Sequence, residues 1–239
     1  FTAETNAAAA ESFCKVVKES APLFGHPMAA GVFYGYMYTP YSPVSGHLAI
    51  DRLLDSPYVD FFSSPKGYHR CRAGDPGGEQ GPSESMALKK VWLDEIDCHT
   101  HLDRRATRAD DEDDSVTLLW REATKNITHG QGFWWMDLGG GWLDSEEIQD
   151  EIVLLNETSR QLYLEEAKQH RVAEVLLVID ENAMHHMRPN FNLHYATIGY
   201  TGATIKESGV PIDFYRTADL EEIDLSGVTK LDTGAFGIR

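Results

Sequence analysis

A ten-residue segment, Trp92 to His101, gathers most of the side chains in this sequence that could carry chemistry. It reads Trp-Leu-Asp-Glu-Ile-Asp-Cys-His-Thr-His, so Glu95, Asp97, His99 and His101 fall within seven positions. The apolar residues that precede Glu95 predict a β-strand, which places these groups at the carboxyl end of that strand. Carboxylates and imidazoles clustered in this way suit two kinds of chemistry, glycoside hydrolysis and metal-assisted hydrolysis.

Glycoside hydrolysis with retention of configuration needs two carboxyl groups about 5–5.5 Å apart, one attacking the anomeric carbon and one protonating the leaving oxygen. A strand end would hold an attacking Glu95 more rigidly than a loop. Sugars also stack their apolar faces on aromatic rings, and such rings recur near the predicted strand ends. They are Tyr36, Tyr38, Tyr68, Trp92, Trp134, Trp135 and Trp142. Core packing explains any one of them, but their clustering favours substrate binding, and we count Tyr36 among the substrate-binding candidates.

A metal site is the competing interpretation of the same segment. In an extended chain His99 and His101 would point to the same side and could share one ion. The motif resembles the first metal motif of the amidohydrolases, but there it follows the first barrel strand, and here it follows the third predicted strand. The later histidines fall in predicted helices, beside Gly130 or in a second domain. We therefore expect no metal and no other cofactor, and the alternative is that both histidines bond to the backbone or to nearby carboxylates.

Strand and helix patterns alternate through the first 170 residues. Helices are predicted over 4–20, 47–54, 115–128 and 145–170, strands over 31–38, 59–63, 89–95 and 132–137, and a long loop over 70–85. The acidic run at 110–114 is interpreted as helix capping rather than ion binding. This order predicts an α/β fold with parallel βα units, either half of an eight-stranded barrel or one open sheet. Polar and aromatic groups follow the strands at their carboxyl ends, which carry the active site in barrel enzymes.

The pattern changes after residue 170. Residues 172–180 form a nearly continuous apolar strand that ends in Asp180, which is typical of strands buried on both faces in doubly wound sheets. A helix over 192–208, interrupted at Gly199 and Gly202, a strand over 210–215 and the start of a third strand at Leu231 follow. We predict a domain boundary near residue 171 and an incomplete second domain.

Several segments together resemble the barrel glycoside hydrolases of clan A, in particular the β-galactosidases of family 42 and their relatives. The matching stretches are 31–38, 46–50, 56–65 with Tyr68, Lys90-Val-Trp-Leu-Asp-Glu-Ile-Asp97 with Thr100, and Gly132-Phe-Trp-Trp-Met-Asp-Leu-Gly-Gly-Gly-Trp142. The resemblance implies that residues 1–170 form the C-terminal half of a TIM barrel, strands five to eight. It implies that residues 171–239 begin a flavodoxin-like domain, which in that family serves in trimer formation and helps to wall the active site.

The resemblance also implies roles for individual residues. Glu95 matches the catalytic nucleophile at the end of the seventh strand. Tyr68 lies where clan members often place a tyrosine that hydrogen-bonds this nucleophile. Trp134 and Trp135 match the substrate platform on the eighth strand. Two further residues, Arg70 and Asp97, are candidates for binding sugar hydroxyls.

Two departures from the family pattern bear on activity. The acid/base glutamate of the family usually follows an asparagine at the end of the fourth barrel strand, which would lie before residue 1. The Asn156-Glu157 pair lies far downstream of that position, so we expect the acid outside this sequence and no activity from these residues alone. The histidines at 99 and 101 replace the usual Arg next to Thr. The alternatives to a glycosidase are a non-catalytic carbohydrate-binding or assembly module and a metal-dependent amidohydrolase-like enzyme.

Composition narrows the partners. The formal charge of −17 over 239 residues repels phosphate backbones, so we expect a carbohydrate substrate and no nucleic acid. No apolar run approaches the ~18–20 residues of a membrane helix, and we expect no membrane partner. Three cysteines do not suggest a disulfide framework, so we expect a reducing, cytoplasmic environment. By resemblance we expect a homo-oligomer, specifically a trimer.

Overall fold

The structure, a computed structural model, describes most of the chain as two compact units of an α/β protein. The described residues are 2–38, 45–79, 81–104, 108–164, 172–187 and 195–233. The first unit comprises Phe1–Ser64, Glu79–Leu93 and Val172–Arg239, and the second comprises Pro65–Gly78 and Asp94–Arg171. The second unit therefore ends beside the predicted boundary, while the segment predicted as a half barrel contributes to both units. The division into domains at 1–170 and 171–239 stays a prediction.

The first sheet has four parallel strands in sequential order. They are β1 (Gly31–Phe33), β2 (Phe61–Pro65), β3 (Val91–Ile96) and β4 (Gly132–Trp135), ordered β1-β2-β3-β4. β1 pairs with β2 in parallel, with Gly31 opposite Phe61. The predicted parallel α/β arrangement is confirmed at this level. Each strand lies within a few residues of the range that the sequence predicts.

The second sheet consists of β5 (Val175–Ile179), β6 (Ile212–Arg216) and β7 (Lys230–Thr233) in the order β6-β5-β7, with both pairings parallel. Every residue of β5 and β6 is buried. On one face Leu177 and Phe214 join the large core of the first unit, and on the other Leu176 and Tyr215 form a smaller cluster. The prediction of a strand buried on both faces is confirmed for β5.

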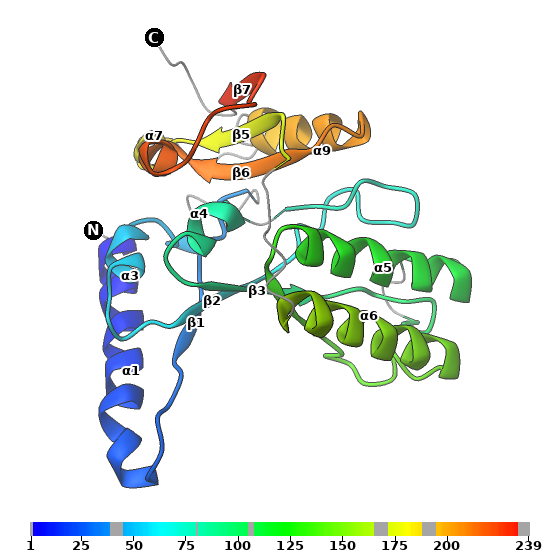
Figure 1. Ribbon diagram of the computed structural model, residues 1–239, viewed down its shortest axis with the longest axis horizontal. Coiled ribbons are helices and arrows are strands. Elements are labelled where there is room, and N and C mark those ends of the chain that lie inside the picture. The colour runs from blue at the N-terminus through cyan, green and yellow to red at the C-terminus, as the bar shows by residue number, and fades with distance from the viewer. Residues whose placement is uncertain are drawn as a thin grey trace. The chain divides into compact units, whose positions relative to one another are not determined.

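Two long helices, α5 (Glu112–Thr128) and α6 (Glu146–Leu164), pack side by side in the second unit (Figure 1). Asp111 caps α5, because its carboxylate accepts a hydrogen bond of 2.9 Å from the backbone N–H of Asp114. The acidic run thus provides a cap and a first turn that suit the helix dipole, as the sequence predicts. The core of this unit lies between these helices and the sheet, and it includes Leu118, Leu119 and Leu155.

Short helices and one long helix complete the first unit. They are α1 (Thr2–Phe24), α3 (Asp51–Leu54), α4 (Ser83–Ala87), α7 (Glu181–Met184), the π-helical turn η1 (Tyr195–Gly199), α9 (Tyr200–Glu207) and the 3₁₀ helix η2 (Thr217–Glu222). α1 packs its small residues, such as Ala7 and Cys14, into the core of this unit. Gly25 follows its last turn with a φ of 73° and ends it.

Several predicted boundaries are wrong for identifiable reasons. The helix predicted over 47–54 is confined to Asp51–Leu54, because Ala49 adopts a φ of 64° that a helix cannot contain. The strand predicted over 31–38 ends at Phe33, and Gly35 follows with a φ of 91°.

Two helices of the first unit also differ from the prediction. Helix α4 begins inside the predicted loop. Gly202 lies inside α9 and does not interrupt it. A Cβ at this position would lie 3.2 Å from Leu177 Cδ2, so the glycine allows close packing against Leu177. Residues 165–170 and 192–194 of the predicted helices lie outside the described residues.

Two expectations from composition can be compared with the structure directly. All three cysteines are buried and none forms a disulfide, as expected. Among the described residues no helix is both long and apolar enough to cross a membrane.

Candidate active site

The two faces of β3 differ in chemistry near its carboxyl end. Ile96 belongs to the core of the second unit together with Leu118 of α5, and Asp94 Oδ2 lies 3.7 Å from Nζ of Lys125 on the same helix. Both side chains therefore face the helices. Because side chains alternate across a strand, Glu95 lies on the opposite face, away from α5 and α6.

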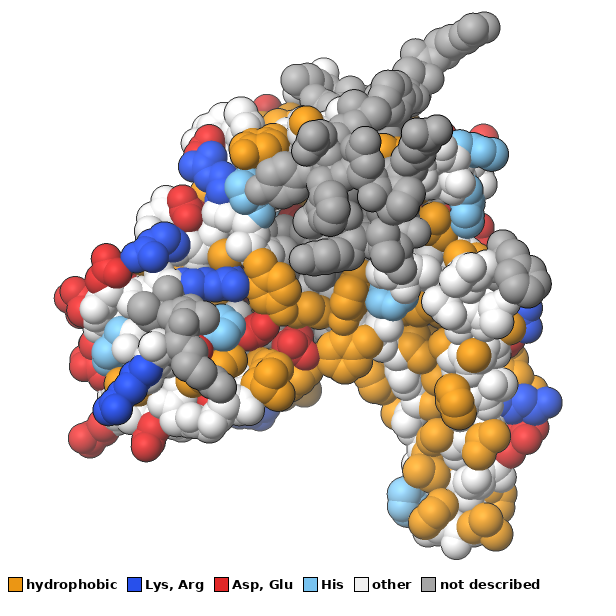
Figure 2. All heavy atoms as spheres, turned by 180° about the vertical axis from the view of Figure 1, so that it is seen from behind, with side chains coloured by type: hydrophobic (Ala, Val, Ile, Leu, Met, Phe, Trp, Pro, Cys, Tyr) orange, Lys and Arg blue, Asp and Glu red, His pale blue; other side chains and the backbone are white. Residues whose placement is uncertain are grey.

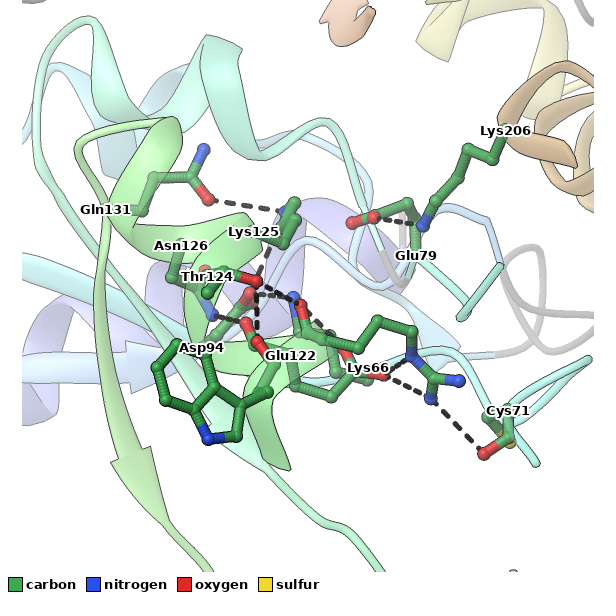
Figure 3. Close-up of polar contacts among 12 residues, drawn as sticks. Lys66, Cys71, Glu79, Asp94, Glu122, Thr124, Lys125, Asn126, Gln131 and Lys206 are labelled. Carbon is green, nitrogen blue, oxygen red and sulfur yellow. Dashed lines mark hydrogen bonds and ion pairs between the residues drawn. The ribbon is translucent and has the colours of Figure 1, made fainter. Parts of the chain in front are cut away.

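A buried polar network lies on the helix side of this strand (Figure 3). Lys66 forms an ion pair with Asp94 and lies 3.6 Å from Glu122 Oε2. Lys125 Nζ lies 3.7 Å from Asp94 Oδ2 and donates to Gln131 Oε1 at 3.3 Å. Charges of opposite sign alternate along this network and compensate one another. They hold β3 against α5 directly beside Glu95.

Glu95 itself is buried, with 6% of its surface exposed. Burial, and after it the negative charge of Asp97, raises the pKa of Glu95 from 4.5 to about 7. The carboxyl group therefore changes its charge near neutral pH. A buried strand-end carboxyl that titrates there is typical of catalytic groups, although buried structural carboxyls also show such shifts.

The two tryptophans of β4 lie on opposite faces of the sheet. The backbone N–H that follows Trp135 donates to the Ile96 carbonyl at 3.2 Å, which sets Trp135 level with Ile96 and Trp134 level with Glu95 in the parallel register. Trp134 is 38% exposed. Trp135 packs against the core of the second unit, and its indole N–H donates to Asn156 Oδ1 of α6 at 2.9 Å. The structure therefore brings Trp134 beside Glu95 and holds Trp135 in the helix layer.

Tyr68 contacts the acidic pair from a neighbouring loop. Its hydroxyl donates to Asp97 Oδ2 at 2.7 Å, while the guanidinium of Arg108 lies 4.9 Å from its ring centroid. Burial of the hydroxyl and the bond to Asp97 raise the pKa of Tyr68, and the charge of Glu95 adds to this shift. Tyr68 therefore remains a protonated donor, and its partner is Asp97 rather than the expected Glu95.

His99 lies between two carboxylates. Its Nδ1 is 2.5 Å from Oδ2 of the buried Asp103, and its Nε2 is 3.5 Å from Asp97 Oδ1. The ring packs against Trp142 with 4.2 Å between the centroids. These contacts fix the ring plane and leave Nε2 directed at Asp97.

His101 has different neighbours. Its Nδ1 and its backbone N–H both contact Ser115 Oγ, at 2.8 and 2.9 Å. The two histidines thus do not turn toward a common point. His99 bonds to carboxylates, as the alternative interpretation predicts, whereas His101 bonds to a serine hydroxyl, which it does not predict. The absence of a catalytic metal stays a prediction.

Two predicted substrate ligands, Arg70 and Tyr36, have contacts with other groups. Arg70, in a left-handed conformation with a φ of 52°, directs its guanidinium to Asp75, with 3.9 Å between Nη2 and Oδ1. Tyr36 belongs to the first unit, where its ring meets His47 edge-on with 4.5 Å between the centroids. Their roles in substrate binding stay predictions.

Sequence reasoning missed Asp103 and Trp142 as neighbours of His99, and Lys66 as the partner of Asp94. Asp103 could have been suspected, because it follows a histidine by four residues near a strand end. Lys66 and Trp142 carry no local signal, because each contacts a distant segment. Lys66 lies 28 positions before Asp94, and Trp142 lies 43 positions after His99.

A separate pocket of about 420 Å³ lies in the first unit at the carboxyl ends of β5 and β6. The guanidinium of the buried Arg216 forms its floor, and it bonds to Asp219 at 2.8 Å, to Asp51 at 2.8 Å and to Glu181 at 3.0 Å. Four of the five N–H donors of this arginine bond to protein carboxylates, so its charge is already compensated within the protein. The cluster around Glu95 is therefore the stronger candidate site.

Comparison with known proteins adds no relative, because no protein family, curated protein or solved structure matches the chain. What the structure establishes is an α/β protein with two parallel sheets and a buried carboxyl group at the end of a strand. The likeness to family 42 rests on the sequence segments given above.

Proposed function

We propose that this chain belongs to a retaining glycoside hydrolase with β-galactosidase-like activity, in which Glu95 is the nucleophile. One observation carries the proposal: the buried Glu95 is in register with the partly exposed Trp134, on the sheet face opposite to α5 and α6. In a closed barrel that face would line the interior, where the carboxyl ends of the strands hold the substrate. An indole beside an attacking carboxylate suits the apolar face of a pyranose.

The order of the strands supports the fold expected from the resemblance. Four parallel strands in sequential order are what a segment of a (β/α)₈ barrel requires, although they would also fit other α/β sheets. The order β6-β5-β7 equals 2-1-3 in chain order, with which flavodoxin-like sheets begin. We therefore keep the C-terminal half barrel and the partial flavodoxin-like domain as parts of the proposal.

The ionisation of Glu95 favours a second role that must be tested beside the first. A nucleophile must be ionised at the working pH, whereas a pKa of about 7 is typical of the acid/base residue of a glycosidase. The resemblance assigns the acid/base role to a different glutamate, at the end of the fourth barrel strand. As a nucleophile Glu95 would become more reactive as the pH rises through about 7, because only the carboxylate attacks.

Covalent trapping tests the nucleophile without any need for an acid. With a dinitrophenyl 2-fluoro-β-galactoside, Glu95 would form a bond to the anomeric carbon while the bond to the aryl oxygen breaks, and dinitrophenolate leaves as an anion without a proton. Mass spectrometry should find one fluorosugar per chain, on a peptide that contains Glu95, at a rate that rises through pH 7. Sugar binding measured by calorimetry, without an adduct from any glycone, would instead indicate a carbohydrate-binding module.

Azide separates the two roles of Glu95 in the same assay. If Glu95 is the nucleophile, azide added to Glu95→Ala should replace it and give the glycosyl azide of inverted configuration. If Glu95 is the acid/base, the variant should still cleave the dinitrophenyl glycoside, and azide should give the retained product. The latter result would overturn the assigned role while it leaves the glycosidase proposal intact.

Self-association is part of the proposal, with a trimer expected from the resemblance. Helix α1 carries a second apolar stripe beside its buried face, made of Phe13, Val16, Leu23 and Phe24, each at least 60% exposed. Figure 2 shows hydrophobic side chains spread along this helix. Exposed stripes of this kind mark contact surfaces.

Light scattering tests the self-association. The wild-type protein should have a mass that is a multiple of 26.8 kDa, and the double variant Leu23→Lys with Phe24→Lys should have a lower mass. A wild-type monomer would contradict this part.

A further inference from the structure

One carboxylate oxygen beside Glu95 lacks a hydrogen-bond donor. Asp97 is 9% exposed, and its Oδ1 accepts no hydrogen bond from the described residues. His99 Nε2 lies 3.5 Å from this oxygen. Buried carboxylates normally accept several hydrogen bonds, so an unsatisfied oxygen in this position calls for a donor from elsewhere.

The rest of the Asp97 side chain is held from two sides. Its Oδ2 accepts the hydroxyl of Tyr68 at 2.7 Å. His99 approaches the other side, and its own ring is fixed by the buried Asp103 and by Trp142. A chain of contacts, Tyr68–Asp97–His99–Asp103, thus orients one carboxylate while one of its oxygens remains without a donor.

We propose that Asp97 Oδ1 accepts a hydrogen bond from a ring hydroxyl of the sugar that Glu95 attacks, and that His99, held by Asp103, is the positioning residue that directs this oxygen. The inference rests on the proposed glycosidase function. Asp97 follows Glu95 by two residues, so both carboxylates lie at the carboxyl end of β3, where one sugar could meet both. Trp134 would contact the apolar face of the sugar while Asp97 binds its polar edge.

This arrangement makes the site selective. A pocket that binds a hydroxyl through a buried carboxylate rejects the analogue without that hydroxyl, because the oxygen is then left unpaired. An ionised aspartate only accepts hydrogen bonds, so it requires a group that donates. Because Asp97 binds a ring hydroxyl of the sugar itself, this selectivity should not depend on the leaving group of the glycoside.

Substrates that each lack one ring hydroxyl test the role of Asp97. In the wild-type protein, one deoxy analogue of a dinitrophenyl glycoside should lose about 10- to 100-fold in kcat/KM, the usual weight of a hydrogen bond to a charged group. In Asp97→Ala the loss at that position should nearly vanish, while losses at the other positions persist. Asp97→Asn provides a near-isosteric second variant if the alanine variant unfolds.

His99 and His101 form a matched pair for the positioning role. His99→Phe keeps a ring against Trp142 but removes both nitrogens, and it should reduce the discrimination between the hydroxyl and deoxy substrates as Asp97→Ala does. His99→Gln keeps a polar group beside Asp97 and Asp103 and should restore part of it. His101→Phe, which alters only the contact with Ser115, should leave the discrimination unchanged.

The outcomes separate this inference from the function on which it rests. A wild-type protein that neither forms an adduct with nor cleaves any activated dinitrophenyl glycoside refutes the proposed function. Cleavage with equal deoxy losses in the wild-type and Asp97 variants keeps the function and refutes the hydroxyl contact. Unchanged discrimination in His99→Phe refutes the positioning role alone.

Discussion

Glu95→Gln should abolish covalent trapping and, at the same time, make the protein more stable at pH 8. Gln keeps the size and hydrogen bonding of the side chain but cannot attack the anomeric carbon, so labelling should fall by several orders of magnitude. The gain in stability follows from the burial of Glu95, with a pKa raised from 4.5 to about 7. The fold therefore favours the neutral acid.

The pH range of the effect follows from the direction of that shift. A carboxyl whose pKa is raised on folding stabilises the fold fully below its unfolded pKa, and this stabilisation is lost as the pH rises from about 4.5 to about 7. Each unit corresponds to about 1.4 kcal/mol, so the ionised group costs on the order of 3 kcal/mol above pH 7. The neutral Gln avoids this cost.

Urea unfolding measures the second effect independently of any activity. We expect Glu95→Gln to match the wild-type protein near pH 4 and to exceed it by about 2–3 kcal/mol at pH 8. Glu147→Gln, on the exposed surface of α6, is the control and should change neither stability nor labelling. An unchanged unfolding free energy at pH 8 would mean that Glu95 is not buried as a charge. A substitution that lowers labelling but raises stability is typical of a functional group.

The α/β class and the positions of most strands were accessible from the sequence because their signals are local. The apolar run of β5, the capped start of α5 and the strand that ends near Glu95 are all set by neighbouring residues. The boundaries failed where distant contacts decide the backbone. At Ala49, the N–H groups of residues 49 and 50 bond to the Glu181 carboxylate, more than 100 positions away. No local pattern could show that bond.

The site was accessible only in part for the same reason. The segment around Glu95 could be recognised, because its chemical groups are adjacent in sequence. Which side each group faces depends on register and helix packing, which is why Trp135 was grouped with Trp134 although α6 binds its indole. The resemblance pairs Tyr68 with the nucleophile, but its hydroxyl donates to Asp97, two residues further along the chain.

The network behind Glu95 should be the most sensitive part of the second unit. Lys66 and Asp94 have side chains only 5% and 4% exposed. Replacing Lys66 with Met would leave Asp94 with Lys125, at 3.7 Å, as its remaining cation among the contacts described. Removing one partner of a buried ion pair weakens the compensation of the other charge, so we expect a loss of about 3 kcal/mol in unfolding free energy.

A second variant identifies the origin of that loss. Lys66→Met combined with Asp94→Leu removes both charges and fills the space with apolar groups, which is often neutral for stability. The double variant should therefore be more stable than Lys66→Met alone. Lys15→Met, which breaks an exposed pair with Glu19 at 3.7 Å, is the matched control and should cost less than about 1 kcal/mol.

The same variants show whether the network acts on the site or only on the fold. If its role is to hold β3 against α5, the double variant should keep Glu95 in place and label at close to the wild-type rate, because Ile96 and Leu118 still pack there. Slow labelling in a stable double variant would mean instead that the buried charges tune Glu95 through space. Equal stability of Lys66→Met and the wild-type protein would contradict the buried pair itself.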